Sequence, residues 1–149
     1  MTAVPLERVS LSPEETRRVG RDLATFLAPG DVVLVSGPLG AGKTELVRGI
    51  AEGLGADPAE VASPTFALVH EYGPAGGGPL LVHADLYRLP EEARADSAAG
   101  ELGLVEASAR GCVVVVEWPE GLDPAPGSHL VAVSVESEGA RRIVVRRAP

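Results

Sequence analysis

The chain has 149 residues, 45% of them hydrophobic and 23% charged, which fits one soluble globular domain and excludes a disordered chain. Its formal net charge of −8 argues against a protein that grips bare nucleic acid by neutralising phosphates. No apolar run approaches the roughly 20 residues of a membrane-spanning helix and no signal peptide is recognisable, so we expect a cytoplasmic protein without a membrane partner.

The N-terminal segment predicts a short strand followed by an amphipathic helix. Residues 6–11 favour an extended opening strand. After it, Ser12 and Glu15 have the spacing of a capping box, and Pro29 with Gly30 ends the helical pattern. Between these signals apolar residues recur at helical spacing, at Val19, Leu23, Phe26 and Leu27.

Strands alternate with helical segments through the rest of the chain. Strands are predicted at 31–36, 63–72, 79–85 and 111–117. The first and last of these are too uniformly apolar to have a solvated face. Helices are predicted at 44–55 and over most of 91–111, where Gly100 or Gly103 interrupts the helix.

The end of the chain predicts a β-hairpin. Residues 128–137 and 140–147 alternate in the manner of strands and flank a turn at Glu138 and Gly139. Strands mixed with helices, at least two of the strands buried on both faces, indicate a three-layer α/β fold. We therefore expect a single domain over residues 1–149, with a mixed, mostly parallel sheet, flanking helices and a C-terminal β-hairpin.

Residues 37–44 read GPLGAGKT and match the nucleotide-binding pattern G-x-x-x-x-G-K-[ST], the P-loop. An apolar strand precedes the motif and a helix follows it, which is the context that this loop requires, so the sheet should be P-loop NTPase-like. Lys43, within the motif, is the only lysine in the chain, whereas every other basic residue is one of twelve arginines.

The motif accounts for this solitary lysine. Glycines let successive backbone N–H groups point at phosphate oxygens, and the start of the following helix adds partial positive charge. A compact ammonium reaches between two phosphates better than a planar guanidinium does, and the Thr44 hydroxyl can bind Mg²⁺. We predict an ATP and Mg²⁺ site with contacts from Gly37, Leu39, Gly40, Ala41, Gly42, Lys43 and Thr44.

Two carboxylates are candidates for the rest of the metal site and for catalysis beside Lys43. Asp85 and Glu117 each end a buried strand, and the carboxyl ends of such strands hold ligands in α/β sheets. Either could bind Mg²⁺ directly, bind it through water, or orient the attacking water, and the sequence does not choose between them. The alternative is an ordinary strand-end acid that faces solvent.

Four further residues have weaker signals. Thr65, in the segment SPTF, is either a nucleotide-sensing residue or the start of a strand. Trp118 directly follows Glu117 and should lie near the rim of the site, whereas His83 is expected to be structural. Arg142 belongs to a basic cluster that is either the solvated part of a strand or a contact for a nucleotide or partner; the cluster is Arg141, Arg142, Arg146 and Arg147.

Three other classes of nucleotide-binding protein compete with an ATPase. A small-molecule kinase needs an arginine-bearing lid and an acceptor pocket, for which 149 residues leave little room. A GTPase usually carries an N-K-x-D element, which a chain without asparagine cannot supply. A non-catalytic module gated by nucleotide would differ from an ATPase only when hydrolysis is measured with and without partners.

Four segments taken together, GPLGAGKT, SPTF, HADLYRL and VEWPE, resemble the TsaE family, also called YjeE. Members are small bacterial P-loop ATPases needed to make threonylcarbamoyladenosine in tRNA, and the resemblance runs from about Ser12 to the final hairpin. The resemblance implies that the chain acts with a TsaB–TsaD-type complex and has a weak ATPase activity that serves the cycle of that complex. From the charge of −8 we expect it to meet tRNA only within that assembly.

The resemblance also implies roles for individual residues. Lys43 and its loop would hold ATP, and Thr44 with Glu117 would coordinate Mg²⁺. Asp85 would be the Walker-B-type acid, Thr65 a switch residue, and Trp118 a neighbour of the nucleotide. Catalysis would be mainly electrostatic, with one of the two acids orienting water. Hydrolysis by the isolated chain should be slow, since no obvious arginine finger adjoins the motifs.

Overall fold

The computed structural model describes residues 6–61, 68–73 and 79–149. In chain order the elements are β1 (Leu6–Ser10), α1 (Pro13–Ala24), β2 (Val32–Ser36), α2 (Lys43–Gly53), the short 3₁₀-helix η1 (Pro58–Glu60), β3 (Val69–Tyr72), β4 (Leu81–Asp85), α3 (Glu91–Ala99), α4 (Leu104–Ala109), β5 (Val113–Glu117), β6 (His129–Ser137) and β7 (Ala140–Arg147). None of the described helices is long and apolar enough to cross a membrane.

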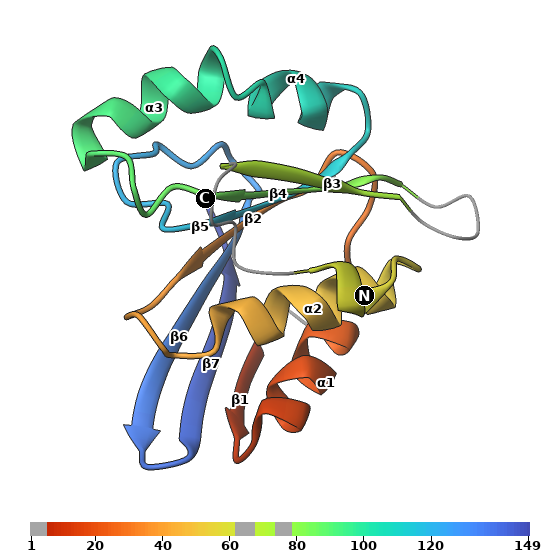
Figure 1. The fold of residues 1–149 in the computed structure, drawn as a ribbon, viewed down its shortest axis with the longest axis vertical. Helices are drawn as coiled ribbons and strands as arrows, with labels where there is room; N and C mark the ends of the chain where they lie inside the picture. Colours follow the sequence, from red (N-terminus) through yellow and green to blue (C-terminus); the bar gives the residue numbers. More distant parts are fainter. Residues whose placement is uncertain (1–5, 62–67, 74–78) are drawn as a thin grey trace.

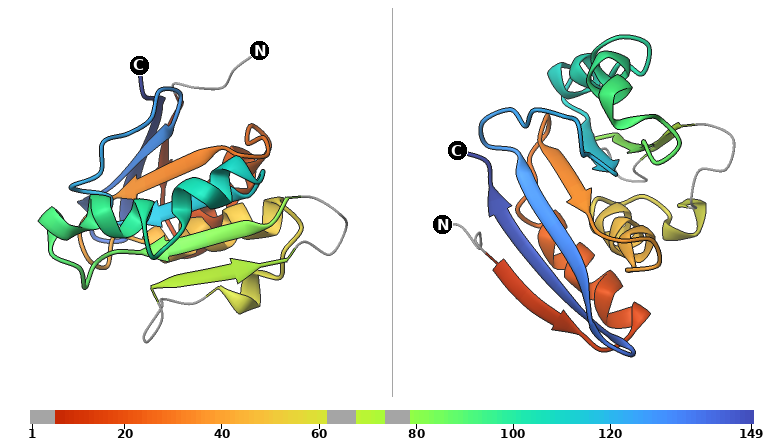
Figure 2. Two further views of the ribbon diagram at one scale, coloured as in Figure 1. Left: turned by 90° about the horizontal axis from the view of Figure 1, so that it is seen from above. Right: turned by 90° about the vertical axis from the view of Figure 1, so that its left-hand side faces the viewer.

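The described strands form one seven-stranded sheet in the order β1-β7-β6-β2-β5-β4-β3. Its four central strands, β6, β2, β5 and β4, run parallel. The strands β7 and β1 at one edge, and β3 at the other, join by antiparallel pairing. Helices α1 and α2 lie on one face of the sheet, and α3 and α4 on the other (Figures 1 and 2). The α/β fold with a mixed sheet, flanking helices and a C-terminal hairpin is confirmed.

Strand β5 shows why the chain forms three layers. Val113 and Val115 belong to the apolar cluster packed against α1 and α2, whereas Val114 and Val116 belong to the cluster under α3 and α4. All four are buried. Successive side chains of a strand point to opposite faces, so a strand covered on both sides must be apolar throughout. The prediction of a strand without a solvated face is confirmed.

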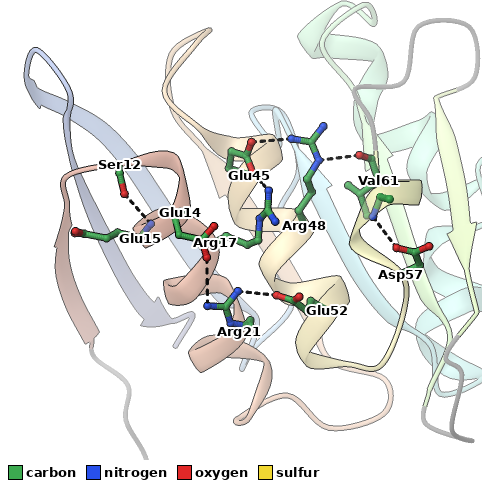
Figure 3. A network of polar contacts seen from close by, with 11 residues as sticks. Ser12, Glu14, Glu15, Arg17, Arg21, Glu45, Arg48, Glu52, Asp57 and Val61 are labelled. Atoms are coloured by element: carbon green, nitrogen blue, oxygen red, sulfur yellow. Dashed lines mark hydrogen bonds and ion pairs between the residues drawn. The ribbon is translucent and has the colours of Figure 1, made fainter.

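Helices α1 and α2 cross at unusually short range. A Cβ added to Gly49 would lie 2.0 Å from the carbonyl oxygen of Arg17, so only glycine fits there. Ion pairs flank the crossing: Arg17 lies 3.2 Å from Glu45, and Arg21 lies 2.6 Å from Glu52 (Figure 3). Helix α2, which begins at Lys43 within the motif of residues 37–44, is therefore held firmly against α1.

The predicted capping box of α1 is present in part: Ser12 caps the helix, but the Glu15 carboxylate reaches back to Leu11, one residue before the cap. The Ser12 hydroxyl accepts a hydrogen bond from the Glu15 N–H at 3.1 Å, and the Glu15 carboxylate accepts one from the Leu11 N–H at 3.0 Å. The predicted C-terminal extent was wrong, because the helix ends at Ala24. Phe26 lies beyond the end and is 36% exposed, so it is not a core residue of the helix.

The helix predicted over residues 91–111 is interrupted at residues 100–103, as its glycines indicated. Helix α3 ends at Ala99, and Gly103 adopts a left-handed φ of 64° immediately before α4. The strand predicted at 63–72 is described only as β3, Val69–Tyr72, since residues 62–67 lie outside the described part of the chain.

Candidate functional site

The loop between β2 and α2 is shaped by its glycines. A Cβ on Gly37 would lie 2.4 Å from the carbonyl oxygen of Val133 in β6, so the loop could not leave the sheet at this position with any other residue. Gly40 and Gly42 have left-handed φ values of 79° and 101°. Gly42 directly precedes the first residue of α2, so the loop ends at a helix N-terminus, where backbone N–H groups attract anions.

Lys43 lies at this helix start and is only 5% exposed. Its ammonium donates to the carbonyl oxygens of Gly37 and of Pro38, the latter at 3.3 Å. The nitrogen lies 3.7 Å from the centre of the Trp118 ring, in a cation–π contact. Burial lowers the pKa of Lys43, and the nearby carboxylates, of which Glu117 contributes most, partly offset this.

The two predicted acids lie side by side. Asp85 and Glu117 end the adjacent parallel strands β4 and β5 and are paired in register. The Asp85 carboxylate accepts a hydrogen bond from the Tyr87 N–H at 3.0 Å. Burial raises the pKa of Asp85; the Tyr87 N–H lowers it in part, and the charge of Glu117 raises it further. Both acids also act electrostatically on Lys43, so the structure brings the three groups together.

Glu117 is buried, which argues against the alternative of an ordinary strand-end acid that faces solvent. It is 2% exposed, and its Oε2 lies 2.6 Å from Nε2 of His83, itself fully buried in β4. His83 and Asp85 are two residues apart on one strand and therefore share a face. The expectation of a merely structural His83 is thus incomplete, because this side chain holds one of the two site acids.

Trp118 turns back toward the loop through an unusual backbone conformation. Among the described residues it is the one non-glycine residue with a positive φ, 59°. Its N–H donates to the carbonyl oxygen of Val35 at 3.3 Å, and its ring packs against Tyr87 with centroids 4.8 Å apart. The predicted position at the rim of the site agrees with this geometry.

Arg142 does not reach the loop. Its guanidinium forms ion pairs with Glu7 and Glu136. Its neighbour Arg141 instead donates to the carbonyl oxygens of Ala41 at 3.1 Å and Gly40 at 3.4 Å. Neighbouring residues of a strand point to opposite faces, so only one of this pair can meet the loop. The structure therefore gives Arg141, and not Arg142, the position beside the site.

The remaining predicted contacts have different exposures. Leu39 is 72% exposed at the outside of the loop, whereas Ala41 is buried. Thr44 occupies the first turn of α2, next to Lys43. Thr65 lies outside the described residues.

Three contacts were not predicted from the sequence: those of His83 with Glu117, of Arg94 with the turn at Trp118, and of Arg141 with the loop. The contact of His83 had a usable signal, because a histidine two residues before an acid at the end of a strand lies on the same face of the sheet as that acid. Arg94, in α3, is buried and contacts the turn that carries Trp118; no periodic pattern marks it. Choosing Arg141 over Arg142 requires the strand register, which the sequence does not contain.

The arrangement is chemically specific. A buried ammonium, helix-terminal N–H groups and two adjacent carboxylates surround the end of one loop. The N–H groups and the ammonium favour an anion, whereas the carboxylates favour a cation. Together they suit an anion that arrives with a divalent metal ion.

The family model described as "Threonylcarbamoyl adenosine biosynthesis protein TsaE" matches residues 10–144. The chain is 48% identical over 110 residues to the "tRNA threonylcarbamoyladenosine biosynthesis protein TsaE" of Streptomyces coelicolor, covering 70% of this chain and 68% of that protein. It is 37% identical over 139 residues to the Bacillus subtilis protein of the same name, covering 93% and 76%. The crystal structure of Bacillus subtilis YdiB superposes with a TM-score of 0.72 at 30% identity, covering 97% of this chain and 86% of that one. The chain therefore belongs to the TsaE family.

Proposed function

We propose that this chain binds ATP with Mg²⁺ at residues 37–44 and hydrolyses it slowly, as an accessory protein of threonylcarbamoyladenosine formation in tRNA. The observation that carries the proposal is the placement of Lys43. The only lysine of the chain is buried where a glycine loop meets a helix, facing two strand-end acids. Its present partners are carbonyl oxygens of its own loop, which phosphate oxygens can replace as stronger, charge-assisted acceptors.

The donor set fits Mg²⁺ held together with a nucleotide. The Thr44 hydroxyl and the carboxylates of Asp85 and Glu117 are the hard oxygen ligands that Mg²⁺ prefers. The described part of the chain holds no group of three or more His, Cys, Asp or Glu residues placed to bind a metal alone. Mg²⁺ sites of this kind use one or two carboxylates with substrate phosphates. When bound, the ion would neutralise negative charge on those phosphates.

The residues of the chain would divide the work of catalysis. Loop N–H groups and the start of α2 bind and orient the phosphates, while Lys43 stabilises the charge that builds on the transferred phosphoryl group. Asp85 and Glu117 are held in fixed positions by the Tyr87 N–H and by His83, and one of them orients the attacking water. Arg141 lies beside the loop, but its guanidinium already bonds the carbonyl oxygens of the loop and is not free to stabilise charge on the transferred phosphoryl group. We therefore expect slow hydrolysis by the isolated chain.

The biological part of the proposal comes from the relatives. Two relatives above are named as proteins of tRNA threonylcarbamoyladenosine biosynthesis. We propose that this chain acts in the same pathway with a TsaB–TsaD-type complex in the cytoplasm. Its formal charge of −8 favours docking on proteins and contact with tRNA only inside that assembly.

Hydrolysis of ATP by wild type, Asp85→Ala, Glu117→Ala and the control Glu106→Ala tests this function. Glu106 is an exposed acid of α4 on the other face of the sheet. We expect slow turnover alone, faster turnover with a reconstituted TsaB–TsaD-type complex, and loss of the stimulated rate in both site variants only. Normal stimulated rates in both would show that the metal site is misplaced. Rapid turnover by the lone chain, or preference for GTP, would contradict the proposal.

A further inference from the structure

Arg94 makes a set of contacts that none of the roles above explains. It belongs to α3 and is 7% exposed. Its Nε donates to the carbonyl oxygen of Leu89 at 3.1 Å. Its Nη1 donates to the carbonyl oxygens of Trp118 at 3.1 Å and Glu120 at 3.0 Å. A buried guanidinium thus bonds three backbone carbonyls in two separate segments.

These two segments are the continuations of the strands that carry the site acids. Leu89 follows β4 and Asp85, and the Trp118–Glu120 turn follows β5 and Glu117. The segments also touch directly, since the Leu86 N–H donates to the carbonyl oxygen of Glu117 at 3.1 Å and Tyr87 packs on Trp118. Arg94 adds the charged link between them.

The turn after β5 needs such a link. Trp118 has a left-handed φ of 59°, which is costly for a bulky residue and persists only where neighbouring contacts impose it. This conformation brings the Trp118 ring over Lys43. Loss of the Arg94 contacts would therefore act on the site through the turn, by shifting the Trp118 ring away from Lys43. Arg94 itself contacts neither Lys43 nor the two acids.

The carbonyl bonds, and not the ion pair with Glu120, carry this effect. The Arg94 nitrogen lies 3.7 Å from the Glu120 carboxylate, which belongs to an exposed residue, and such pairs contribute little. The planar guanidinium can donate to the three carbonyl oxygens at once, because its N–H groups point in several fixed directions. The lysine ammonium is a compact charge at the end of a shorter side chain and cannot span both segments. Lysine should therefore not replace arginine here.

We propose that Arg94 is a positioning residue that clamps the turn after β5 to the segment after β4, and thereby sets Trp118 over Lys43 for nucleotide binding. The expected effect of Arg94 on nucleotide binding rests on the function proposed above. Its effect on the position of Trp118 does not rest on that function, because it is measured on the protein without ligand.

Trp118 is the only tryptophan, so fluorescence excited at wavelengths where the two tyrosines do not absorb reports on this turn alone. The experiment compares wild type, Arg94→Met, Arg94→Lys and the control Arg110→Ala, whose arginine is exposed at the end of α4. Each protein is measured for thermal unfolding, for acrylamide quenching of Trp118 without nucleotide, and for the Kd of magnesium-ATP by calorimetry.

We expect Arg94→Met and Arg94→Lys, both still folded, to show red-shifted emission and stronger quenching. Magnesium-ATP should bind about tenfold more weakly to both, which is the lower end of the losses seen when residues that support metal ligands are removed, because Arg94 acts on the site only through the turn. Arg110→Ala should match wild type. If Arg94→Met does not fold, Arg94→Lys, which keeps the charge, decides the question.

Native quenching and native affinity in a folded Arg94 variant would overturn the proposal. Full rescue by lysine would also overturn it, since a simple charge would then suffice. Should wild type bind no magnesium-ATP, the proposed function fails, whereas the quenching comparison still decides the role of Arg94.

Discussion

Replacing His83 by phenylalanine tests whether the buried histidine holds Glu117 in place. Phenylalanine keeps a ring of similar size, so little cavity forms in β4. It removes the nitrogen that lies 2.6 Å from the Glu117 carboxylate, which is only 2% exposed. The variant therefore removes one hydrogen-bonding partner from a buried acid, and it also removes the Nδ1 of His83, a buried nitrogen without a partner, whose loss offsets part of the cost.

The expected cost can be worked out from these contacts. Leaving a buried hydrogen-bonding group without its partner costs about 1–3 kcal/mol, and more for a charged group. Glu117 is almost fully buried, so we take the upper value of this range, about 3 kcal/mol. In a domain of this size that corresponds to a fall in Tm of about 6–12 °C.

Urea unfolding of wild type, His83→Phe, Glu117→Leu and the double variant measures the coupling. Glu117→Leu leaves Nε2 of His83 without its partner at a cost of about 1–3 kcal/mol. The double variant puts two apolar side chains in contact, so it should lose at least about 2 kcal/mol less than the sum of the single changes. Single effects that add within about 0.5 kcal/mol would refute the pairing.

Two further predictions concern Asp85 and the neighbouring arginines. Burial raises the pKa of Asp85 in the folded chain, so ionisation of Asp85 opposes folding. The stability that the protonated Asp85 contributes is fully present below its pKa in the unfolded chain. This stability is lost as the pH rises through the higher pKa in the folded chain. Asp85→Asn should therefore unfold at a higher temperature than wild type at pH 7, and the difference should be smaller at pH 3. The variant should also bind nucleotide more weakly in the presence of Mg²⁺. Equal melting temperatures at pH 7 would contradict this reasoning. Arg141→Ala removes two donors to the loop carbonyls of Gly40 and Ala41 and should weaken nucleotide binding severalfold, whereas Arg142→Ala should not, as titration calorimetry on the matched pair will show. A larger loss in Arg142→Ala would restore the contact predicted from sequence.

Much of the fold follows from local patterns. The run of valines in β5 identified a strand covered on both faces, and Ser12 with Glu15 located the start of α1. Gly103 divides α3 from α4 because its left-handed φ suits glycine. The end of α1 was not predictable in this way, since Phe26 continues the helical spacing beyond the point where the helix ends.

The site was predictable where the residues are close in sequence or share a strand end. The loop at 37–44 was predicted from its motif, and Asp85 and Glu117 were predicted as neighbours because parallel strands end at one edge of the sheet, where the structure places both. Arg94 was not, because its contact with the Trp118 turn joins residues 24 apart in sequence and follows no periodicity. The choice between Arg141 and Arg142 depends on a register that a shift of one residue would reverse.

The central claim is that the Lys43 ammonium and its loop hold the phosphates of ATP. Titration calorimetry of ATP, with and without Mg²⁺, into wild type, Lys43→Ala and the control Arg110→Ala tests it most directly, with melting curves to establish that each protein is folded. We predict magnesium-dependent binding to wild type and to the control, and none to Lys43→Ala. Equal binding to folded Lys43→Ala, or no binding to wild type, would contradict the account.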